Sequence, residues 1–387
     1  MFAFLSLYAA ILLALTYSAS GAAVTQPSLE KRAQCSASLT IALSVARRLQ
    51  DHYYNSGNGQ YTGGSLWTDA NTLEDLHNLM LATGTNNFSS VADNSFLGRA
   101  ANNANTNWQT FLGGSNDDAG WIVLALWKMA DYKANRGQSN TAFLNSASKI
   151  YDIIAGQWDG VCGGGVWWST AHTYKNAITN ELFLLLSAQG YRRGFGQKYL
   201  DNAKKTWTWL KNSGMRNSQN LWNDGLTDDC KNNGQTTWTY NQGVIASGLA
   251  ELAVVTGDRS LLTEAEKTLD ATISRLTTNN ILKESCDNAQ SGGSVCNQDQ
   301  QLFKGLWTKH LQFYLDAANE ASRTDKYRGF LGSQMSAVYH FGTNANNDVG
   351  SVWYAPNQGG SVFTPKTSAS GLEAHIASAK YGPCPAV

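Results

Sequence analysis

The chain has 387 residues, with 29 Lys and Arg balanced by 29 Asp and Glu, so its formal net charge is zero. A neutral chain offers no electrostatic basis for binding nucleic acid or an anionic membrane. Only 15% of the residues are charged, whereas the chain contains 13 Trp, 16 Tyr and 36 Gly. Because aromatic rings stack on the apolar faces of sugars, this composition favours a neutral carbohydrate as the ligand.

The N-terminal segment predicts export. An apolar run over residues 1–18 is followed by small residues up to 23, which is typical of a signal peptide covering 1–22. The alternative is a membrane anchor, but the run is short compared with the roughly 20 residues that span a bilayer. The pair Lys31-Arg32 resembles a processing site, which would extend a pro-segment to 32; otherwise these are two surface charges. We expect a secreted protein with a single mature domain over 33–387.

Six cysteines are present, and an even number in an oxidising compartment favours disulfides. The sequence alone does not fix their connectivity. A zinc site is the weaker alternative, because no Cys-x-x-Cys spacing occurs. The sequon at Asn87 predicts N-glycosylation, and the C-terminus has no hydrophobic tail that would direct a lipid anchor. The candidate pairs are the loop-flanking Cys286 with Cys296, the terminal Cys35 with Cys384, and the remaining Cys162 with Cys230.

Apolar residues recur at helical spacing in eleven segments, and no convincing series of strands is present. The first segment, 38–54, has its stripe on Leu39, Ile41, Ala42, Val45 and Leu49. We therefore predict an all-α fold. The other ten segments, in chain order, are 73–82, 120–133, 142–157, 176–189, 199–211, 242–255, 261–276, 300–320, 327–340 and 367–379.

Long connections alternate with short ones between these segments. Loops longer than about 12–15 residues are usually functional. Helix pairs joined in this way predict α-hairpins closed into an (α/α)-barrel, with the long loops at one open end. An open α-solenoid is the alternative, but the sequence shows no fixed repeat period. The five long connections are 55–67, 159–171, 214–239, 279–297 and 343–364.

The pair Asp117-Asp118 stands where a loop becomes the predicted helix 120–133. Glycoside hydrolysis uses two carboxyl groups: one protonates the leaving oxygen, and the other attacks the anomeric carbon or activates water. Neighbouring side chains at a helix start can meet the ~5–5.5 Å separation of retaining enzymes. Two adjacent carboxylates also split each other's pKa values. The alternative is an ordinary helix start with Asn116 as N-cap and acidic residues favoured by the helix dipole.

Three motifs of the chain together resemble glycoside hydrolase family 76, which includes α-1,6-mannanases and related fungal cell-wall enzymes. The resemblance covers the whole mature chain, in order. It implies an (α/α)6 barrel and a retaining mechanism with consecutive aspartates, in which Asp117 is the nucleophile and Asp118 the general acid/base. The motifs are Asn116-Asp117-Asp118-Ala119-Gly120-Trp121, Trp238-Thr239-Tyr240-Asn241-Gln242-Gly243 and Phe303-Lys304-Gly305.

Further polar and aromatic residues are candidates for sugar contact. Asp69 and Asn71 begin a helix after a long loop, where they serve equally well as caps. Trp168 ends a Gly-rich loop and is either a stacking platform or a packing residue. Asn180 lies inside an apolar helix, facing the pocket or satisfied in the core. The remaining candidates stand at or near the three motifs, or in the loop 214–239: Trp121, Asp228, Tyr240, Asn241, Gln242 and Lys304.

Two of these candidates have specific alternatives. Asp228 belongs to Asp228-Asp229-Cys230, which is a rival carboxylate pair as well as a source of one binding carboxylate. Lys304 has apolar neighbours and would bind a hydroxyl or tune a carboxylate; otherwise it is a surface lysine.

We expect a retaining, endo-acting hydrolase of α-1,6-mannosidic linkages in α-mannan or mannooligosaccharides, without metal or cofactor, and monomeric. The six histidines show no ligand spacing, and neither a nucleophile elbow nor a nucleotide loop occurs. One alternative is a cell-wall transglycosidase. A second is a non-catalytic sugar-binding protein, which predicts loss of one paired aspartate. A third is another (α/α)-barrel enzyme such as a lyase, which needs a basic pocket.

Overall fold

The computed structural model describes residues 35–287, 296–356 and 360–384, which belong to one compact unit. The predicted signal peptide 1–22 and pro-segment lie outside these described residues. Helices dominate the structure, as predicted. The described strands form two antiparallel hairpins of two residues per strand: β1 (Tyr54–Asn55) with β2 (Gln60–Tyr61), and β3 (Thr277–Thr278) with β4 (Ile281–Leu282).

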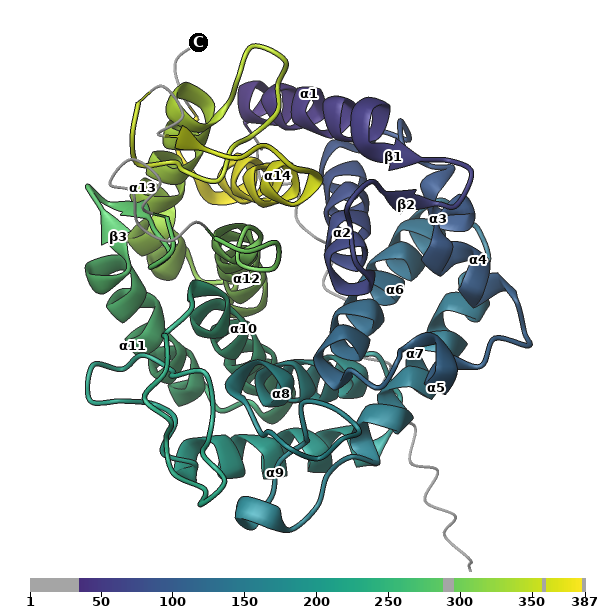
Figure 1. Ribbon diagram of the computed structural model, residues 1–387, viewed down its shortest axis with the longest axis vertical. Coiled ribbons are helices and arrows are strands. Elements are labelled where there is room, and N and C mark those ends of the chain that lie inside the picture. The colour runs from purple at the N-terminus through teal and green to yellow at the C-terminus, as the bar shows by residue number, and fades with distance from the viewer. Residues whose placement is uncertain (1–34, 288–295, 357–359, 385–387) are drawn as a thin grey trace, which may run out of the picture. The chain divides into compact units, whose positions relative to one another are not determined.

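Six helices form an inner ring, which is seen end-on in Figure 1. Each contacts the next one around the ring, and the last contacts the first. The ring is therefore closed. This confirms the predicted all-α barrel and excludes the alternative of an open solenoid. The inner helices are α2 (Leu66–Thr83), α6 (Asn116–Asn135), α8 (Ala177–Arg192), α10 (Thr239–Thr256), α12 (Phe303–Ala318) and α14 (Pro365–Tyr381).

Outer helices pack behind this ring. Between α2 and α6, three short helices take the place of one long outer helix, and no periodicity in the sequence had indicated them. They are α3 (Val91–Asn94), α4 (Phe96–Asn102) and α5 (Trp108–Phe111). The long outer helices are α1 (Ser36–Tyr53), α7 (Thr141–Ala155), α9 (Gln197–Asn212), α11 (Ser260–Arg275) and α13 (Ala321–Ala337). A 3₁₀ turn, η1 (Val161–Gly163), and a π-helical turn, η3 (Val338–Gly342), are also present.

The burial patterns explain which helices are inside. Helix α9 buries one stripe, including Tyr199, Ala203 and Leu210, and exposes its other face. An amphipathic helix of this kind covers a core from outside. In contrast, every residue of α10 from Thr239 to Ala253 is buried. A helix that is surrounded on all sides belongs inside the ring.

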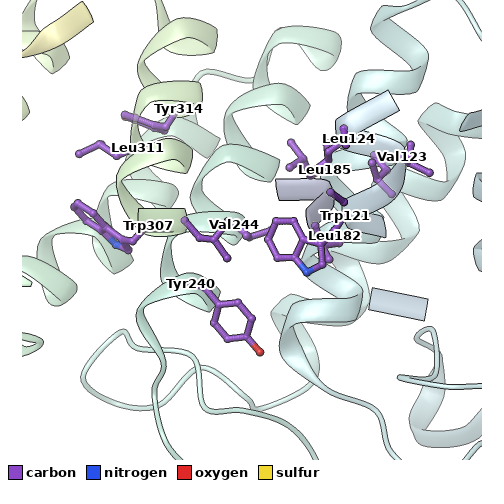
Figure 2. Close-up of a cluster of buried hydrophobic side chains, with 14 of the residues drawn as sticks. Trp121, Val123, Leu124, Leu182, Leu185, Tyr240, Val244, Trp307, Leu311 and Tyr314 are labelled. Atoms are coloured by element: carbon purple, nitrogen blue, oxygen red, sulfur yellow. The ribbon is translucent and has the colours of Figure 1, made fainter. Parts of the chain in front are cut away.

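Glycines permit the inner helices to approach closely. A Cβ on Gly243 of α10 would lie 2.9 Å from the Trp307 Cα of α12, and one on Gly305 of α12 would lie 2.4 Å from the Ser370 Cα of α14. Larger side chains fill the remaining space: in Figure 2, residues of α6, α8, α10 and α12, including Trp121 and Trp307, gather in one cluster.

The six cysteines form three disulfides, two of which link distant parts of the chain. Their connectivity, which the sequence left open, is Cys35–Cys384, Cys162–Cys230 and Cys286–Cys296. The first joins the two ends of the described chain across 349 residues. The second ties the loop before α8 to the loop before α10, across 68 residues. Among the described residues, no helix is long and apolar enough to cross a membrane.

Candidate active site

A cavity of about 350 Å³ opens where the inner helices begin. The first turns of α2, α6, α10 and α12 and the N-cap of α8 all contribute to its wall. The positive ends of several helix dipoles therefore converge on it, which favours negative charge there. Its lining residues are Trp67, Asp117, Asp118, Trp121, Trp168, Tyr174, Asn176, Asp224, Trp238, Tyr240, Asn297, Asp299, Gln300 and Phe303.

The pair Asp117-Asp118 lies in the first turn of α6, half-buried at this cavity. The helix begins one residue earlier than a cap on Asn116 would require. Ser115 occupies the N-cap position, while the Asn116 amide donates to the Trp167 carbonyl at 2.9 Å and its backbone N–H donates to the Trp168 carbonyl at 2.9 Å. The start of α6 is thus fixed to the loop that precedes α8.

The two carboxyl groups have different environments. Asp117 accepts hydrogen bonds from the Ser115 hydroxyl at 2.7 Å and from the Trp168 indole N–H at 3.0 Å. Burial raises the pKa of Asp117, and these two donors oppose that rise. For Asp118, burial and the charge of Asp117 together raise the pKa to about 7. Since hydrogen bonds to an anion favour the charged form, Asp117 is the group that ionises first and Asp118 the group that keeps the proton.

Aromatic residues form much of the remaining wall. The rings of Trp67 and Trp121 lie 6.0 Å apart, and Tyr240 stacks on Phe303 at 3.9 Å. Trp168 is 42% exposed at the cavity, although its N–H is directed to Asp117. The structure thus brings three of the predicted contact residues, Trp121, Trp168 and Tyr240, into the same cavity as the paired aspartates.

Two further carboxylates of the cavity were missed by the sequence analysis. Asp224 accepts a hydrogen bond from the Tyr174 hydroxyl at 2.6 Å, and Asp299 accepts one from the Trp67 indole N–H at 3.0 Å. Each is an isolated aspartate. Asp299 stands just before α12, as Asp117-Asp118 stands at the start of α6. A single acid in a loop carries no local signal of this kind, so the sequence did not indicate it.

Several predicted contact residues lie outside the cavity lining, although they are buried. Asp69 accepts a hydrogen bond from the Tyr61 backbone N–H at 3.0 Å, and burial raises its pKa to about 7. Asn71 accepts from the Lys309 ammonium at 2.8 Å. Lys304 pairs with Asp287 and donates to the Ser351 carbonyl at 2.9 Å, so it is a buried lysine and not a surface one. These three polar groups are satisfied within the protein.

The amides predicted to face the sugar are also buried away from the cavity lining. Asn180 holds the loop before α8 through the Val166 backbone, accepting from its N–H at 2.7 Å and donating to its carbonyl at 3.0 Å. Gln242 similarly accepts a hydrogen bond from the Trp222 backbone N–H and donates one to the Trp222 carbonyl. Asn241 is fully buried. Two of these amides therefore position loops that form the wall.

The rival pair at Asp228-Asp229 lies outside the cavity lining. Both residues are exposed, and Asp229 forms an ion pair with Lys231 at 2.6 Å. In the described residues, the one cluster with metal-like spacing is Cys286, Asp287 and Cys296, but its sulfurs are joined in a disulfide and are not thiolates. The carboxyl groups that do line the cavity, which include those of Asp117 and Asp118, suit it to acid–base and nucleophilic chemistry.

Comparison with known proteins identifies the family. The sequence profile described as "Glycosyl hydrolase family 76" matches residues 39–382. The chain belongs to glycoside hydrolase family 76. This confirms the resemblance drawn from the three motifs, and the chain is accordingly a glycoside hydrolase.

Fungal proteins are among the relatives of this family-76 chain. It is 26% identical to a Schizosaccharomyces pombe protein provisionally named mannan endo-1,6-α-mannosidase, over 83% of this chain and 74% of that protein. It is 28% identical to the mannan endo-1,6-α-mannosidase DFG5 of Candida albicans, over 56% of this chain and 49% of that protein. The chain thus matches about half the length of the Candida relative.

Solved structures of family 76 share the fold. The GH76A α-1,6-mannanase from Salegentibacter sp. HEL1_6 superposes with a TM-score of 0.75 at 22% identity, covering 88% of this chain and 99% of that one. An inactive variant of that enzyme, with two consecutive aspartates replaced, forms a complex with α-1,6-mannotetrose. Dfg5 from Chaetomium thermophilum, in complex with glucosamine, has a TM-score of 0.75 at 18% identity, covering 88% and 90%.

Proposed function

We propose that this family-76 protein is a retaining, endo-acting hydrolase of the α-1,6-mannosidic bonds of mannan. The single observation that carries the proposal is the Asp117-Asp118 pair, whose two carboxyl groups face one cavity from different environments. The names of the fungal relatives and the α-1,6-mannotetrose complex of the bacterial enzyme support the choice of substrate.

In this mechanism the two aspartates have separate roles. Asp117, ionised and oriented by Ser115 and Trp168, attacks the anomeric carbon and forms a glycosyl ester. Asp118 gives its proton to the leaving glycosidic oxygen in that step. It then accepts a proton from the water that cleaves the ester, which restores both groups and retains the configuration. The aromatic wall supplies faces on which the sugar rings stack.

We also propose that the enzyme acts outside the cell. Three disulfides favour an oxidising compartment, which agrees with the predicted signal peptide over 1–22. Asn87 of the predicted glycosylation sequon is exposed.

A transglycosidase is the second candidate function. The exposed indole of Trp168 lies at the cavity beside Asp117, where it offers a platform for an acceptor sugar. A hydroxyl of that sugar, in place of water, would then resolve the glycosyl ester.

The test is product analysis with linear α-1,6-mannan, alone and with a mannooligosaccharide acceptor. We expect internal cleavage by the wild type, with the α-anomer formed first in proton NMR spectra. Both Asp117→Asn and Asp118→Asn should lower kcat by about 10³-fold or more, the range seen when a nucleophile or general acid is removed. Full activity in either variant contradicts the assignment, and extension of the acceptor without net hydrolysis favours the transglycosidase.

A further inference from the structure

A short turn before α12 places another carboxylate, besides that of Asp224, in the cavity that contains the paired aspartates. Asn297, Asp299 and Gln300 all line this cavity. The turn is fixed internally, because the Asn297 side chain accepts from the backbone N–H groups of Asp299 and Gln300, both at 3.0 Å. The Gln300 side chain in turn accepts from the Asn297 backbone N–H at 2.9 Å.

The turn is also held from outside by two inner helices. The Trp67 indole of α2 donates to Asp299 at 3.0 Å, and the Lys366 ammonium of α14 donates to the Gln298 side chain at 2.7 Å. The Asp299 carboxylate is therefore a fixed charge on the wall and not a mobile loop side chain.

We propose that Asp299 is a positioning residue of the reaction, whose fixed negative charge keeps the proton on Asp118. The inference rests on the proposed function, in which Asp118 is the general acid. It differs from that function in assigning the protonation of Asp118 to a residue from another part of the chain.

The charges around Asp118 support this assignment. Burial is the largest cause of the raised pKa of Asp118, and the charge of Asp117 is the next. The Ser115 hydroxyl lowers that pKa, and the charge of Asp299 raises it as the smallest of these four contributions. Asp117 is needed as the nucleophile, so Asp299 is the additional charge. The other titratable or charged groups that face the cavity or this turn are Asp224, Tyr174, Tyr240 and Lys366.

The expected effect has a definite sign. A general acid must be protonated, so kcat/KM falls as the pH rises above its pKa. Because like charge disfavours the Asp118 anion, removing the Asp299 charge lowers the pKa of Asp118 and moves the alkaline limb to lower pH. Adding a charge to the same turn moves that limb to higher pH. The limb belongs to the coupled Asp117-Asp118 pair, so its position is compared between proteins.

The chain offers a pair of opposite variants. Asp299→Asn keeps a carbonyl oxygen for the Trp67 N–H but removes the charge. Gln300→Glu keeps an acceptor for the Asn297 N–H but adds a charge. Asp228→Asn is the matched control, since it removes an exposed carboxylate outside the cavity lining.

The experiment is the pH dependence of kcat/KM on α-1,6-mannooligosaccharides for the wild type and these three variants. We expect the limb to move down by about half a pH unit or more in Asp299→Asn, which is roughly a threefold loss on the alkaline side. It should move up in Gln300→Glu and stay in place in Asp228→Asn. A change confined to KM or to overall kcat, with the limb unmoved in both cavity variants, overturns the proposal.

A second readout separates this inference from the proposed function. The carboxyl carbon of Asp118, assigned by comparison with Asp118→Asn, is titrated by NMR without substrate. Shifts of its titration midpoint in opposite directions in the two cavity variants support the role of Asp299 even where no mannan is cleaved. An unchanged midpoint in both contradicts it even in an active enzyme. If one cavity variant fails to fold, the other decides alone.

Discussion

At the scale of single residues, the hydrogen bond between Trp168 and Asp117 connects two parts of the site. The exposed indole is available to a sugar, and its N–H contacts one oxygen of the carboxylate at 3.0 Å. The neighbouring Trp167 is different. Its N–H donates to Asp159 at 2.7 Å, and its ring stacks on His172 outside the cavity lining. Two adjacent tryptophans therefore have separate functions, one at the site and one in the loop.

Replacing Trp168 by Phe should move the acidic limb of the kcat/KM profile to higher pH. The variant keeps an aromatic ring but loses the donor that lowers the pKa of Asp117, so Asp117 ionises at higher pH. A hydrogen bond to a charged group contributes about 1.5–3 kcal/mol, so the limb should move by about one to two pH units. Trp167→Phe is the control and should leave the limb unmoved. An identical limb in both variants would show that the donor is not needed.

At the scale of helices and loops, apolar periodicity revealed the helices but not all of their starts. The predicted helices began at residues 73, 120 and 242, whereas α2, α6 and α10 begin at 66, 116 and 239. The missing first turns contain residues such as Asp69, Asp117 and Asn241. They are polar because this end of the ring contains the cavity and its buried polar support. An apolar pattern does not extend into such turns, so a site of this kind lies where the pattern ends.

The dependence on local sequence pattern also explains which site residues were predicted. The paired aspartates were visible because two acids adjoin at a helix start, whereas Asp224 and Asp299 are single acids in loops that reach the cavity only through the fold. Asp69, Asn71 and Lys304 were visible as polar residues, but polarity does not distinguish a sugar contact from a buried hydrogen bond. Burial comes from the closing of the ring, which the sequence near each residue does not encode.

The close contact between α10 and α12 gives a test of the packing. A Cβ at Gly243 would lie 2.9 Å from the Trp307 Cα, which is backbone and cannot rotate away. Gly243→Ala should therefore lower the free energy of unfolding by about 1–3 kcal/mol, as overpacking does. In the exposed part of α13, Gly329→Ala meets no atom within 4 Å. That control should be neutral or stabilising by up to about 1 kcal/mol. Equal stability of the two variants in urea unfolding would contradict the close packing.

At the scale of the whole molecule, the buried Lys309 links the two inner helices that complete the ring. Lys309 of α12 forms ion pairs with Glu74 and Asp75 of α2 at 2.9 and 3.0 Å, and with Glu373 of α14 at 2.8 Å. It thus joins the first and last inner helices, which are distant in the sequence. Three carboxyl groups exceed one ammonium, and burial raises the pKa of Asp75 to about 6 and that of Glu373 well above its usual value.

Replacing Lys309 by Met should destabilise the closed ring in a pH-dependent way. Removing one partner from a buried ion pair costs about 3–5 kcal/mol, because the remaining charges are left unpaired. A carboxyl whose folded pKa is raised favours folding below its unfolded pKa of about 4, and this contribution is lost as the pH rises through the folded value. Without the ammonium the carboxyl pKa values rise further, so the stability deficit should grow from pH 4.5 to pH 7.5.

The measurement is the free energy of urea unfolding for the wild type and Lys309→Met at both pH values. Lys198→Met is the matched control, since Lys198 pairs with Asp152 at 2.7 Å on the surface, where both side chains are more than half exposed. Loss of a surface pair of this kind costs about 0–1 kcal/mol. A deficit in Lys309→Met that matches this control, or one that shrinks as the pH rises, would show that the ring closes without the ammonium. A large deficit that grows with pH would establish that the contact between α2 and α14 depends on the Lys309 ammonium.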